Sequence, residues 1–318
     1  MKKNYHNING QQGIALLMAI VIVAFVVIIS VSMITQRQLQ IYRTANIYNK
    51  EQAWQYALAS ERWAISVLSQ DYKNEIKTTQ VSDGYQDVWN QSLENLNKIK
   101  VEGSIKDLQG RFNLNNLFYK NKVQTQWLKA YRQLLINFKL PASLADSLVD
   151  WIDSDSSTFG SDGAEDEYYL SLRPAYRPSN TYLVQLSELL LIKGYNQDII
   201  DTLKPYVYVV ADRTAVNINT ADKQVLKAVM NSISEKQIIA IVEQQKKKSF
   251  QSMDELIKSD FMKNSSIDKN LLSVSSGYFM VSSKAQVNGY QIMLNSLLKR
   301  DGRGEIAIIS RREIPLYE

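Results

Sequence analysis

The sequence contains no cysteine, and its single histidine is His6, near the N-terminus. Without cysteine, disulfide bonds cannot support the fold. A mature chain that lacked the first residues would also lack histidine, which excludes Ser-His-Asp and Cys-His catalytic groups and an ordinary zinc site. Carboxylates remain as acid–base groups or as ligands for a hard cation. We therefore expect a protein that is not an enzyme.

Charge is absent from a long segment near the N-terminus, because residues 14–34 contain no Asp, Glu, Lys or Arg. A helix of about 20 apolar residues crosses the hydrocarbon core of a membrane. A secretory signal peptide would have a shorter apolar segment followed by a small-residue cleavage site, and no such site follows here. Lys2 and Lys3 precede the segment, so the positive-inside rule places the N-terminus in the cytoplasm and the rest of the chain outside. The sequence predicts one transmembrane segment, at residues 14–36.

A glycine directly precedes this apolar segment. A short basic leader, residues 1–13, that ends in Gly13 and is followed at once by apolar residues from Ile14 resembles the signal of type IV pilins and pseudopilins. In that family a membrane prepilin peptidase cleaves after the glycine, the helix stays on the mature protein, and the new N-terminus is methylated. The resemblance implies cleavage between Gly13 and Ile14. An ordinary N-terminal membrane anchor with a chance glycine is the alternative.

The segment after the apolar run is also typical of a helix, because residues 36–68 contain no glycine or proline. Apolar residues recur there at helical spacing and predict one apolar stripe. The stripe consists of Ile47, Trp54, Leu58, Ile65 and Leu68, and Glu51 and Glu61 fall on it as well. One helix from residue 14 to about residue 69 would be roughly 84 Å long at 1.5 Å per residue. Its first half would lie in lipid and its second half on a soluble domain.

The middle of the chain reads mostly as helices, and its end reads as strands. The expected helices are at residues 123–138, 142–152, 184–193, 197–203, 221–230 and 235–246. Thr220 and Ser234 are expected N-caps, because their hydroxyls can accept hydrogen bonds from the first turn. Period-two alternation appears weakly at residues 100–108 and clearly from residue 279 to 298, across the hairpin signal Asn288-Gly289. A turn at 301–304 leads into a further strand at 305–311. These patterns predict an α+β fold with a small antiparallel sheet interrupted by a helical insertion.

The strongest chemical feature is a group of acids with no Lys or Arg between Lys139 and Arg173. The acids are Asp146, Asp150, Asp153, Asp155, Asp162, Glu165, Asp166 and Glu167. Residues 154–163 form a turn-rich loop, and acidic side chains on and beside such a loop repel one another unless a cation lies among them. Ca²⁺ takes six to eight oxygen ligands, which suits a flexible acidic loop, although the spacing is not that of an EF-hand. A solvated acidic loop without a metal is the alternative.

Several motifs, in order along the chain, resemble the K-type minor pseudopilins of type II secretion systems. They are EQAWQYAL (51–58), GRFNLNNL (110–117), DWIDSD (150–155), GAEDEYY (163–169), PAYRPSN (174–180), SEL with KGY (187–189, 193–195) and VNINTA (216–221). The resemblance implies a pseudopilin fold with a long N-terminal transmembrane helix, a small antiparallel sheet and a large inserted α-helical domain. The implied divisions are a leader at 1–13, a transmembrane half-helix at 14–36, a helix-plus-sheet domain at 37–115 and 276–318, and an insert at 116–275.

The resemblance also implies a function. The family's proposed place is the tip of the pseudopilus, with I-type and J-type minor pseudopilins, the major pseudopilin and the inner-membrane secretion platform as partners. The chain would then be a single-pass inner-membrane protein with a periplasmic globular domain, and would assist export of folded proteins across the outer membrane. Most pilins carry Glu at mature position five, which is thought to pair with the N-terminal amine of a neighbouring subunit. Here that position is Met18, and the K-type family also lacks the Glu, although a chance absence would look the same.

The family's metal-bound loop corresponds to the acidic motif of this chain. Together with the acid cluster it points to a Ca²⁺ site with carboxylate ligands from Asp153, Asp155, Glu165 and Asp166 and an amide oxygen from Asn180. Ser154, Ser156 and Ser157 fall where other members often carry Pro or further acids. That departure leaves the ligand set open.

Residues 216–257 offer a competing function, because they are similar to helix-hairpin-helix modules that bind the DNA backbone. Such hairpins usually need glycine in the connector, so that backbone amides reach phosphate. The connector at 231–233 has no glycine, and a lysine run such as 246–248 is more often a solvated helix end. A pilin-like DNA-uptake protein is therefore the second hypothesis, and nucleic acid is an unexpected partner.

Overall fold

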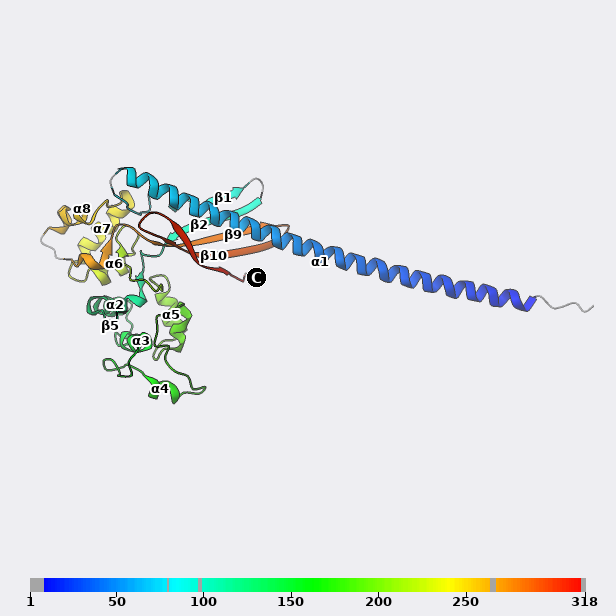
Figure 1. Ribbon diagram of the computed structural model, residues 1–318, viewed down its shortest axis with the longest axis horizontal. Coiled ribbons are helices and arrows are strands. Elements are labelled where there is room, and N and C mark those ends of the chain that lie inside the picture. The colour runs from blue at the N-terminus through cyan, green and yellow to red at the C-terminus, as the bar shows by residue number, and fades with distance from the viewer. Residues whose placement is uncertain (1–8, 79, 97–98, 264–266, 316–318) are drawn as a thin grey trace, which may run out of the picture.

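The structure, a computed structural model, describes residues 9–78, 80–96, 99–263 and 267–315 (Figure 1). Helix α1 (Asn9–Thr78) has 70 residues, which is about 105 Å at 1.5 Å per residue. Its first half extends alone to one side, and its second half lies along the rest of the molecule. The continuous helix predicted from residue 14 is confirmed, and it is longer at both ends.

The first half of α1 is exposed and apolar. Within the described residues, α1 is the one helix long and apolar enough to cross a membrane. The predicted transmembrane segment at 14–36 lies inside it, and Gly13 and Ile14 are both helical. Most of the predicted leader, with Lys2 and Lys3, lies outside the described residues.

The second half of α1 packs on the sheet through small residues. The fully buried residues of this face include Ala53, Ala57, Ala64 and Leu68. The predicted stripe is therefore only partly correct, since Ile47 is 71% exposed. Alanines let the helix backbone approach the sheet closely, and larger residues flank them. The face that packs is centred on the small residues.

A five-stranded antiparallel sheet faces this helix. Its strands are β1 (Leu93–Leu96), β2 (Ile99–Asp107), β9 (Tyr278–Val287), β10 (Tyr290–Arg300) and β11 (Ile306–Glu313), in the spatial order β1-β2-β9-β10-β11. Buried and half-buried residues alternate along β9 and β10, because one face packs under α1 and the other is partly open to solvent. The predicted hairpin is confirmed: Asn288 and Gly289 have φ of 47° and 85°, as a two-residue turn of type I′ requires.

The chain between β2 and β9 forms the helical insertion. These two strands are direct neighbours in the sheet, and Asp107 pairs with Phe279, so the insertion leaves and returns at one place. Its core is continuous and includes Trp127, Tyr131 and Tyr169, each at most 1% exposed. Strand β2 ends at Asp107 and strand β9 begins at Tyr278, so the insert predicted at 116–275 lies within the segment between these two strands.

The insertion consists of short helices and very short strands. The α-helices are α2 (Thr125–Asn137), α3 (Leu144–Ile152), α4 (Asp166–Leu170), α5 (Gln197–Leu203), α6 (Lys223–Val229), α7 (Glu235–Lys247) and α8 (Met253–Lys258). The strand pairs are β3 (Phe112–Asn113) with β6 (Val207–Tyr208), β4 (Phe118–Tyr119) with β5 (Lys122–Val123), and β7 (Val216–Asn217) with β8 (Leu272–Ser273). The helix predicted at 184–193 is a 3₁₀ helix, η3 (Leu186–Leu191). The sequence reading did not include α4 and α8.

One of the two predicted N-caps is correct. Ser234 caps α7 in a capping box with Gln237. Thr220 is not the cap of α6, because the helix starts later and the Asp222 side chain accepts from the amide of Gln224 instead. The Thr220 hydroxyl donates to the carboxylate of Asp107 at the end of β2.

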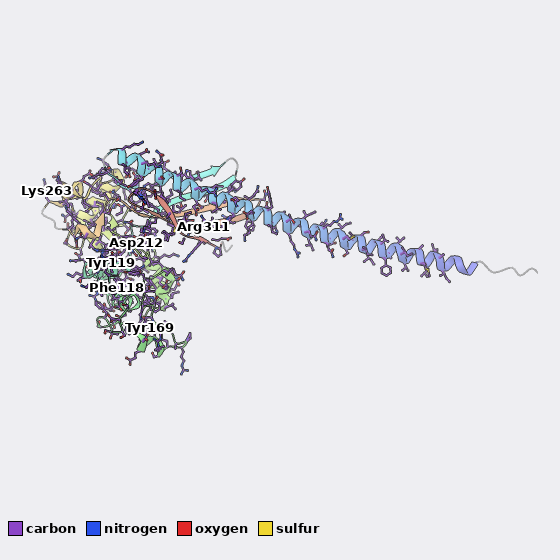
Figure 2. The ribbon with its side chains drawn as sticks, in the orientation of Figure 1. Phe118, Tyr119, Tyr169, Asp212, Lys263 and Arg311 are labelled. Carbon is purple, nitrogen blue, oxygen red and sulfur yellow. The ribbon has the colours of Figure 1, made fainter. Side chains whose placement is uncertain are left out.

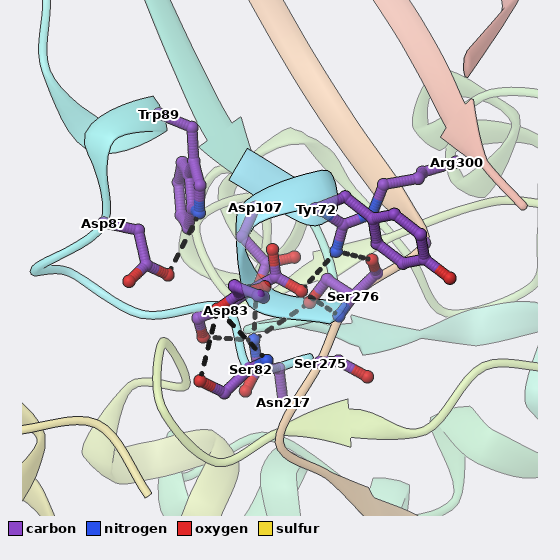
Figure 3. Close-up of polar contacts among 12 residues, drawn as sticks. Tyr72, Ser82, Asp83, Asp87, Trp89, Asp107, Asn217, Ser275, Ser276 and Arg300 are labelled. Carbon is purple, nitrogen blue, oxygen red and sulfur yellow. Dashed lines mark hydrogen bonds and ion pairs between the residues drawn. The ribbon is translucent and has the colours of Figure 1, made fainter. Parts of the chain in front are cut away.

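A buried polar network joins α1, the sheet and the insertion (Figure 3). Asp83, in the segment after α1, forms an ion pair with Arg300 of β10, and both side chains are at most 2% exposed. Asn217 of β7 donates to the backbone oxygen of Asp83 and to the Asp107 carboxylate, each at 2.9 Å. Because these residues come from four separate segments, the network fixes the insertion relative to the sheet.

A second ion pair attaches the C-terminal strand to α1. The carboxylate of Glu61 is 2% exposed and accepts two hydrogen bonds from Arg311 of β11, at 2.6 and 2.8 Å. Arg311 is labelled in Figure 2. The hydroxyl of Ser296 also donates to Glu61. The acid that interrupts the predicted apolar stripe is thus buried and paired.

Candidate metal centre in the inserted domain

Two acids of α3 hold the acidic loop in place. Asp150 accepts hydrogen bonds from the backbone amides of Phe159 at 2.8 Å and Ala164 at 2.6 Å. Asp146, one turn earlier, accepts from the amide of Ser161 at 3.3 Å and from Arg132 at 2.5 Å. Two of the eight acids thus position the loop.

The loop approaches α3 closely because of two glycines. A Cβ at Gly160 would lie 2.2 Å from an oxygen of Asp146, and one at Gly163 would lie 2.3 Å from an oxygen of Asp150. Gly160 also has a φ of +68°, which side chains rarely adopt. Any larger residue at either position would push the loop away from the helix.

Three other acids come together at the end of α3 and the start of α4. Asp153, Asp155 and Glu165 each place a carboxylate oxygen within 4.8 Å of the others. Asp153 and Glu165 are buried, at 3% and 6% exposure, and Asp155 is exposed. Within the described residues, no Lys or Arg nitrogen forms an ion pair with any of the three. The like charges therefore lie together without a neutralising group.

The electrostatics of this trio follow from that arrangement. Burial, together with the charges of Asp155 and Asp150, raises the pKa of Asp153 to about 6. Burial and the surrounding carboxylates raise the pKa of Glu165 to about 7. Buried atoms Oδ1 of Asp153 and Oε1 of Glu165 have no hydrogen-bond partner among the described residues. Buried polar atoms are rarely left unsatisfied, which is a specific reason to expect a missing partner.

The structure brings together three of the five predicted ligands. Asp166 is outside the trio, because its Oδ2 accepts from Arg177 at 2.9 Å in an exposed ion pair. Asn180 is exposed, and its backbone amide donates to the oxygen of Trp151 at 3.0 Å. That hydrogen bond attaches residue 180 to the end of α3, next to Asp153. The trio itself offers only oxygen atoms and negative charge, which fits a hard divalent cation.

The sequence reading missed a second trio, formed by Asp71, Glu75 and Asp87. Asp71 and Glu75 lie one turn apart near the end of α1, and Asp87 comes from the segment that follows. Burial is the main cause that raises the pKa of Asp71 to about 7 and that of Glu75 to about 8. The spacing of Asp71 and Glu75 is a sequence signal for a shared helix face, but Asp87 joins them only through the path of the chain after α1.

The DNA-binding hypothesis gains no support from the structure. The connector between α6 and α7, residues 230–234, has no glycine. Lys246 and Lys247 are exposed in the last turn of α7, where positive charge favours the helix dipole. Their place at a helix end explains the positive charge without a DNA partner.

Comparisons with known proteins agree on one family. Two family models, both described as type II secretion system protein K, match residues 110–212 and 216–275. The chain is 34% identical to type II secretion system protein K of Pseudomonas aeruginosa over 312 residues, which is 95% of this chain and 92% of the relative. It is 33% identical to protein K of Aeromonas hydrophila over 224 residues, or 66% of this chain and 67% of the relative.

The fold has a match among solved structures. A chain in the crystal structure of the GspK-GspI-GspJ complex from enterotoxigenic Escherichia coli superimposes with a TM-score of 0.74 at 25% identity, covering 86% of this chain and 100% of that chain. The predicted pseudopilin fold is thereby confirmed. The chain belongs to the type II secretion system protein K family, whose members are structural, non-enzymatic pseudopilins.

Proposed function

We propose that this chain is the minor pseudopilin at the tip of a type II secretion pseudopilus, where it contributes to export of folded proteins across the outer membrane. The observation that carries this proposal is the similarity to a chain of the GspK-GspI-GspJ complex along that chain's full length. The partners are accordingly subunits of the GspI and GspJ types, the major pseudopilin and the inner-membrane platform.

The residue at position 18 supports a place at the end of the assembly. A carboxylate in the bilayer costs about 3 kcal/mol on insertion scales and is retained where a partner offsets that cost. Met18 is apolar and lies in the exposed first half of α1. A subunit with no other subunit stacked above it has no amine to neutralise, so it needs no acid there.

Immunogold electron microscopy of sheared pseudopili from a strain that carries an epitope-tagged copy of the full chain tests the location. The tag is expected at one end of each filament, and the full chain is expected to co-purify with the GspI-type and GspJ-type subunits. Label along the whole filament would contradict a tip location. Normal secretion in a strain that lacks the chain would contradict the role in export.

Processing is the next part of the proposal. Gly13 is exposed and an added Cβ would meet nothing within 4 Å, so the bond to Ile14 is sterically accessible. Prepilin peptidase would cleave this bond and leave a methylated Ile14, with α1 in the inner membrane and the globular part in the periplasm. Mass spectrometry of the membrane-extracted protein should show this terminus, and Gly13→Val should accumulate the precursor. An intact Met1 terminus in cells that have the peptidase would contradict processing.

We also propose that Asp153, Asp155 and Glu165 bind a single Ca²⁺ ion. The unpartnered buried oxygens of Asp153 and Glu165 support it, and the ion would supply the positive charge that the trio lacks. Titration calorimetry of the full chain in detergent should show calcium binding that Glu165→Gln removes. Glu167→Gln is the matched control, because Glu167 is an exposed acid two residues away. Equal binding by both variants would mean that the acids form only a solvated loop.

A further inference from the structure

Arg111 is a half-buried charge with no partner among the described residues. It lies just after β2, in the segment where the chain leaves the sheet for the insertion. Its guanidinium makes no hydrogen bond or ion pair with any residue in the described ranges. Burial lowers the pKa of Arg111, and the nearby charge of Asp107 opposes that effect. A charged group that leaves water without compensation is costly, so an arginine in this position needs an explanation.

Two acids near Arg111, Asp107 and Asp222, accept hydrogen bonds from neutral donors. Asp107 accepts at Oδ1 from the amide of Gln109 at 2.8 Å, and at Oδ2 from Asn217 at 2.9 Å and from the Thr220 hydroxyl. Asp222 accepts from the amide of Gln224 at 2.8 Å as the cap of α6. Within the described residues, neither carboxylate forms an ion pair with the guanidinium.

Arg111 lines a cavity of about 310 Å³ between the sheet and the insertion. Trp89 and Ile105 form apolar parts of its wall, Lys106 is an exposed positive charge on it, and Gly110 lies on the side of Thr220. A Cβ at Gly110 would lie 2.7 Å from the oxygen of Thr220. The close approach of these two backbones therefore shapes the cavity and requires glycine next to the arginine.

A second hollow adjoins the first across Tyr85. It measures about 620 Å³, shares Tyr85 and Asp222 with the first, and is also lined by Lys223 and Lys246. The Tyr85 hydroxyl donates to the oxygen of Thr220 at 2.8 Å, which holds the ring between the two hollows. Lys223 pairs with Glu235 at 2.7 Å, whereas Lys246 is exposed and has no ion pair with the described residues. Unpaired positive charge thus occurs on both sides of Tyr85.

We propose that these two hollows form a docking site for an acidic segment of a protein partner, with one carboxylate of that segment bound by Arg111. Arginine suits this role because its planar guanidinium binds a carboxylate through two parallel hydrogen bonds. The first cavity has room for one acidic side chain against Trp89 and Ile105. Because positive charge continues past Tyr85 to Lys246, the ligand is extended, as a polypeptide is. This inference does not depend on the tip location or on calcium.

Fluorescence anisotropy with the full chain in detergent and labelled hexaglutamate tests the proposal. We expect saturable binding that weakens with salt, and a labelled glycine-serine hexamer should not bind. Arg111→Met should weaken hexaglutamate binding at least tenfold. Arg303→Met is the matched control, since Arg303 is an exposed arginine in the 301–304 turn, and it should bind as the wild type does.

Thermal unfolding separates a binding role from a structural one. If Arg111 serves a partner, Arg111→Met should leave the melting temperature equal or higher, because the variant removes an unpaired half-buried charge. A lowered melting temperature with unchanged hexaglutamate binding would overturn the proposal, as would an absence of binding by the wild type. Free glutarate that binds as tightly as hexaglutamate would also overturn it, in favour of a small-molecule site.

Discussion

The two carboxylate trios of this protein differ in what surrounds them. Asp71, Glu75 and Asp87 lie near the buried Arg300, whose charge lowers the pKa of Asp71 and of Asp87 against the larger effect of burial. No such cation opposes the rise in the pKa of Asp153 and of Glu165. A trio with a built-in cation can be stabilised by that charge and by protonation. A trio without one is the better candidate for an external ion.

The largest expected loss of stability follows from removing the cation near the first trio, Arg300. Arg300→Met leaves Asp83 as an uncompensated buried charge, and breaking a buried pair in this way costs about 3–5 kcal/mol of stability. Urea unfolding of the full chain in detergent, followed by tryptophan fluorescence, measures the change. Arg303→Met should cost less than about 1 kcal/mol, because its ion pairs are exposed. Adding Asp83→Asn to Arg300→Met should restore part of the loss, and no restoration would mean that packing dominates.

Calcium should act on one trio only. At a free concentration 100-fold above its dissociation constant, a ligand that binds only the folded state stabilises it by about 2.7 kcal/mol. The melting temperature of wild type and of Asp71→Asn should therefore rise with calcium, and that of Glu165→Gln should not. If the melting temperature of Asp71→Asn no longer rises with calcium while that of Glu165→Gln still does, calcium binds at the trio that contains Asp71 and not at the trio that contains Glu165.

The pH dependence of stability should report the protonation of the trio formed by Asp71, Glu75 and Asp87. Asp71 and Glu75 have pKa values of about 7 and about 8, above their ordinary values, so the folded state holds more protons than the unfolded state between about pH 4 and pH 8. Stability should therefore fall as pH rises through this window, with a slope of at most about 1.4 kcal/mol per pH unit for each group.

Chemical denaturation from pH 5 to pH 8 in calcium measures this slope with the other trio held constant. The double variant Asp71→Asn/Glu75→Gln should show a flatter profile, because its amides do not titrate. If the stability of the wild type rises with pH instead, Asp71 and Glu75 are ionised and paired in the folded protein.

The smallest expected effect concerns Asp166. Its pair with Arg177 is exposed, at 40% and 70% of the two side chains, so Asp166→Asn should cost less than about 1 kcal/mol. The calcium affinity of the Asp166→Asn variant should also differ from that of the wild type much less than the affinity of the Glu165→Gln variant does. If Asp166→Asn lowers the calcium affinity as much as Glu165→Gln does, Asp166 is a ligand, as the sequence predicted. The ion pair between Asp166 and Arg177 would then break when calcium binds.

Features set by neighbouring residues were predictable from the sequence. Asn288-Gly289 specifies its turn through the conformations of two adjacent residues, and Ser234 caps α7 through residues three positions apart. The buried face of α1 was less predictable, because alanines such as Ala57 give little hydrophobic signal and become core residues only against the sheet. The pairing of Glu61 with Arg311 joins residues 250 positions apart, so no local pattern shows it.

The same reasoning applies to the acidic loop. Its composition marks it as unusual, but the role of each acid depends on where the backbone turns. Asp150 binds the amides of Phe159 and Ala164, whereas Asp153 faces Asp155 and Glu165. The sequence contains all of these acids in one short segment and cannot divide them between loop anchoring, ion pairing and the trio.

The place where the insertion meets the sheet has a consequence for modularity. Asp107 and Phe279 are partners in one ladder, and paired residues of antiparallel strands lie about 5 Å apart. A two-residue hairpin turn could therefore join β2 to β9 directly, as Asn288-Gly289 joins β9 to β10. The insertion thus connects two strands that could pair with each other in its absence. It can gain or lose sequence over evolution while the register of the sheet stays the same.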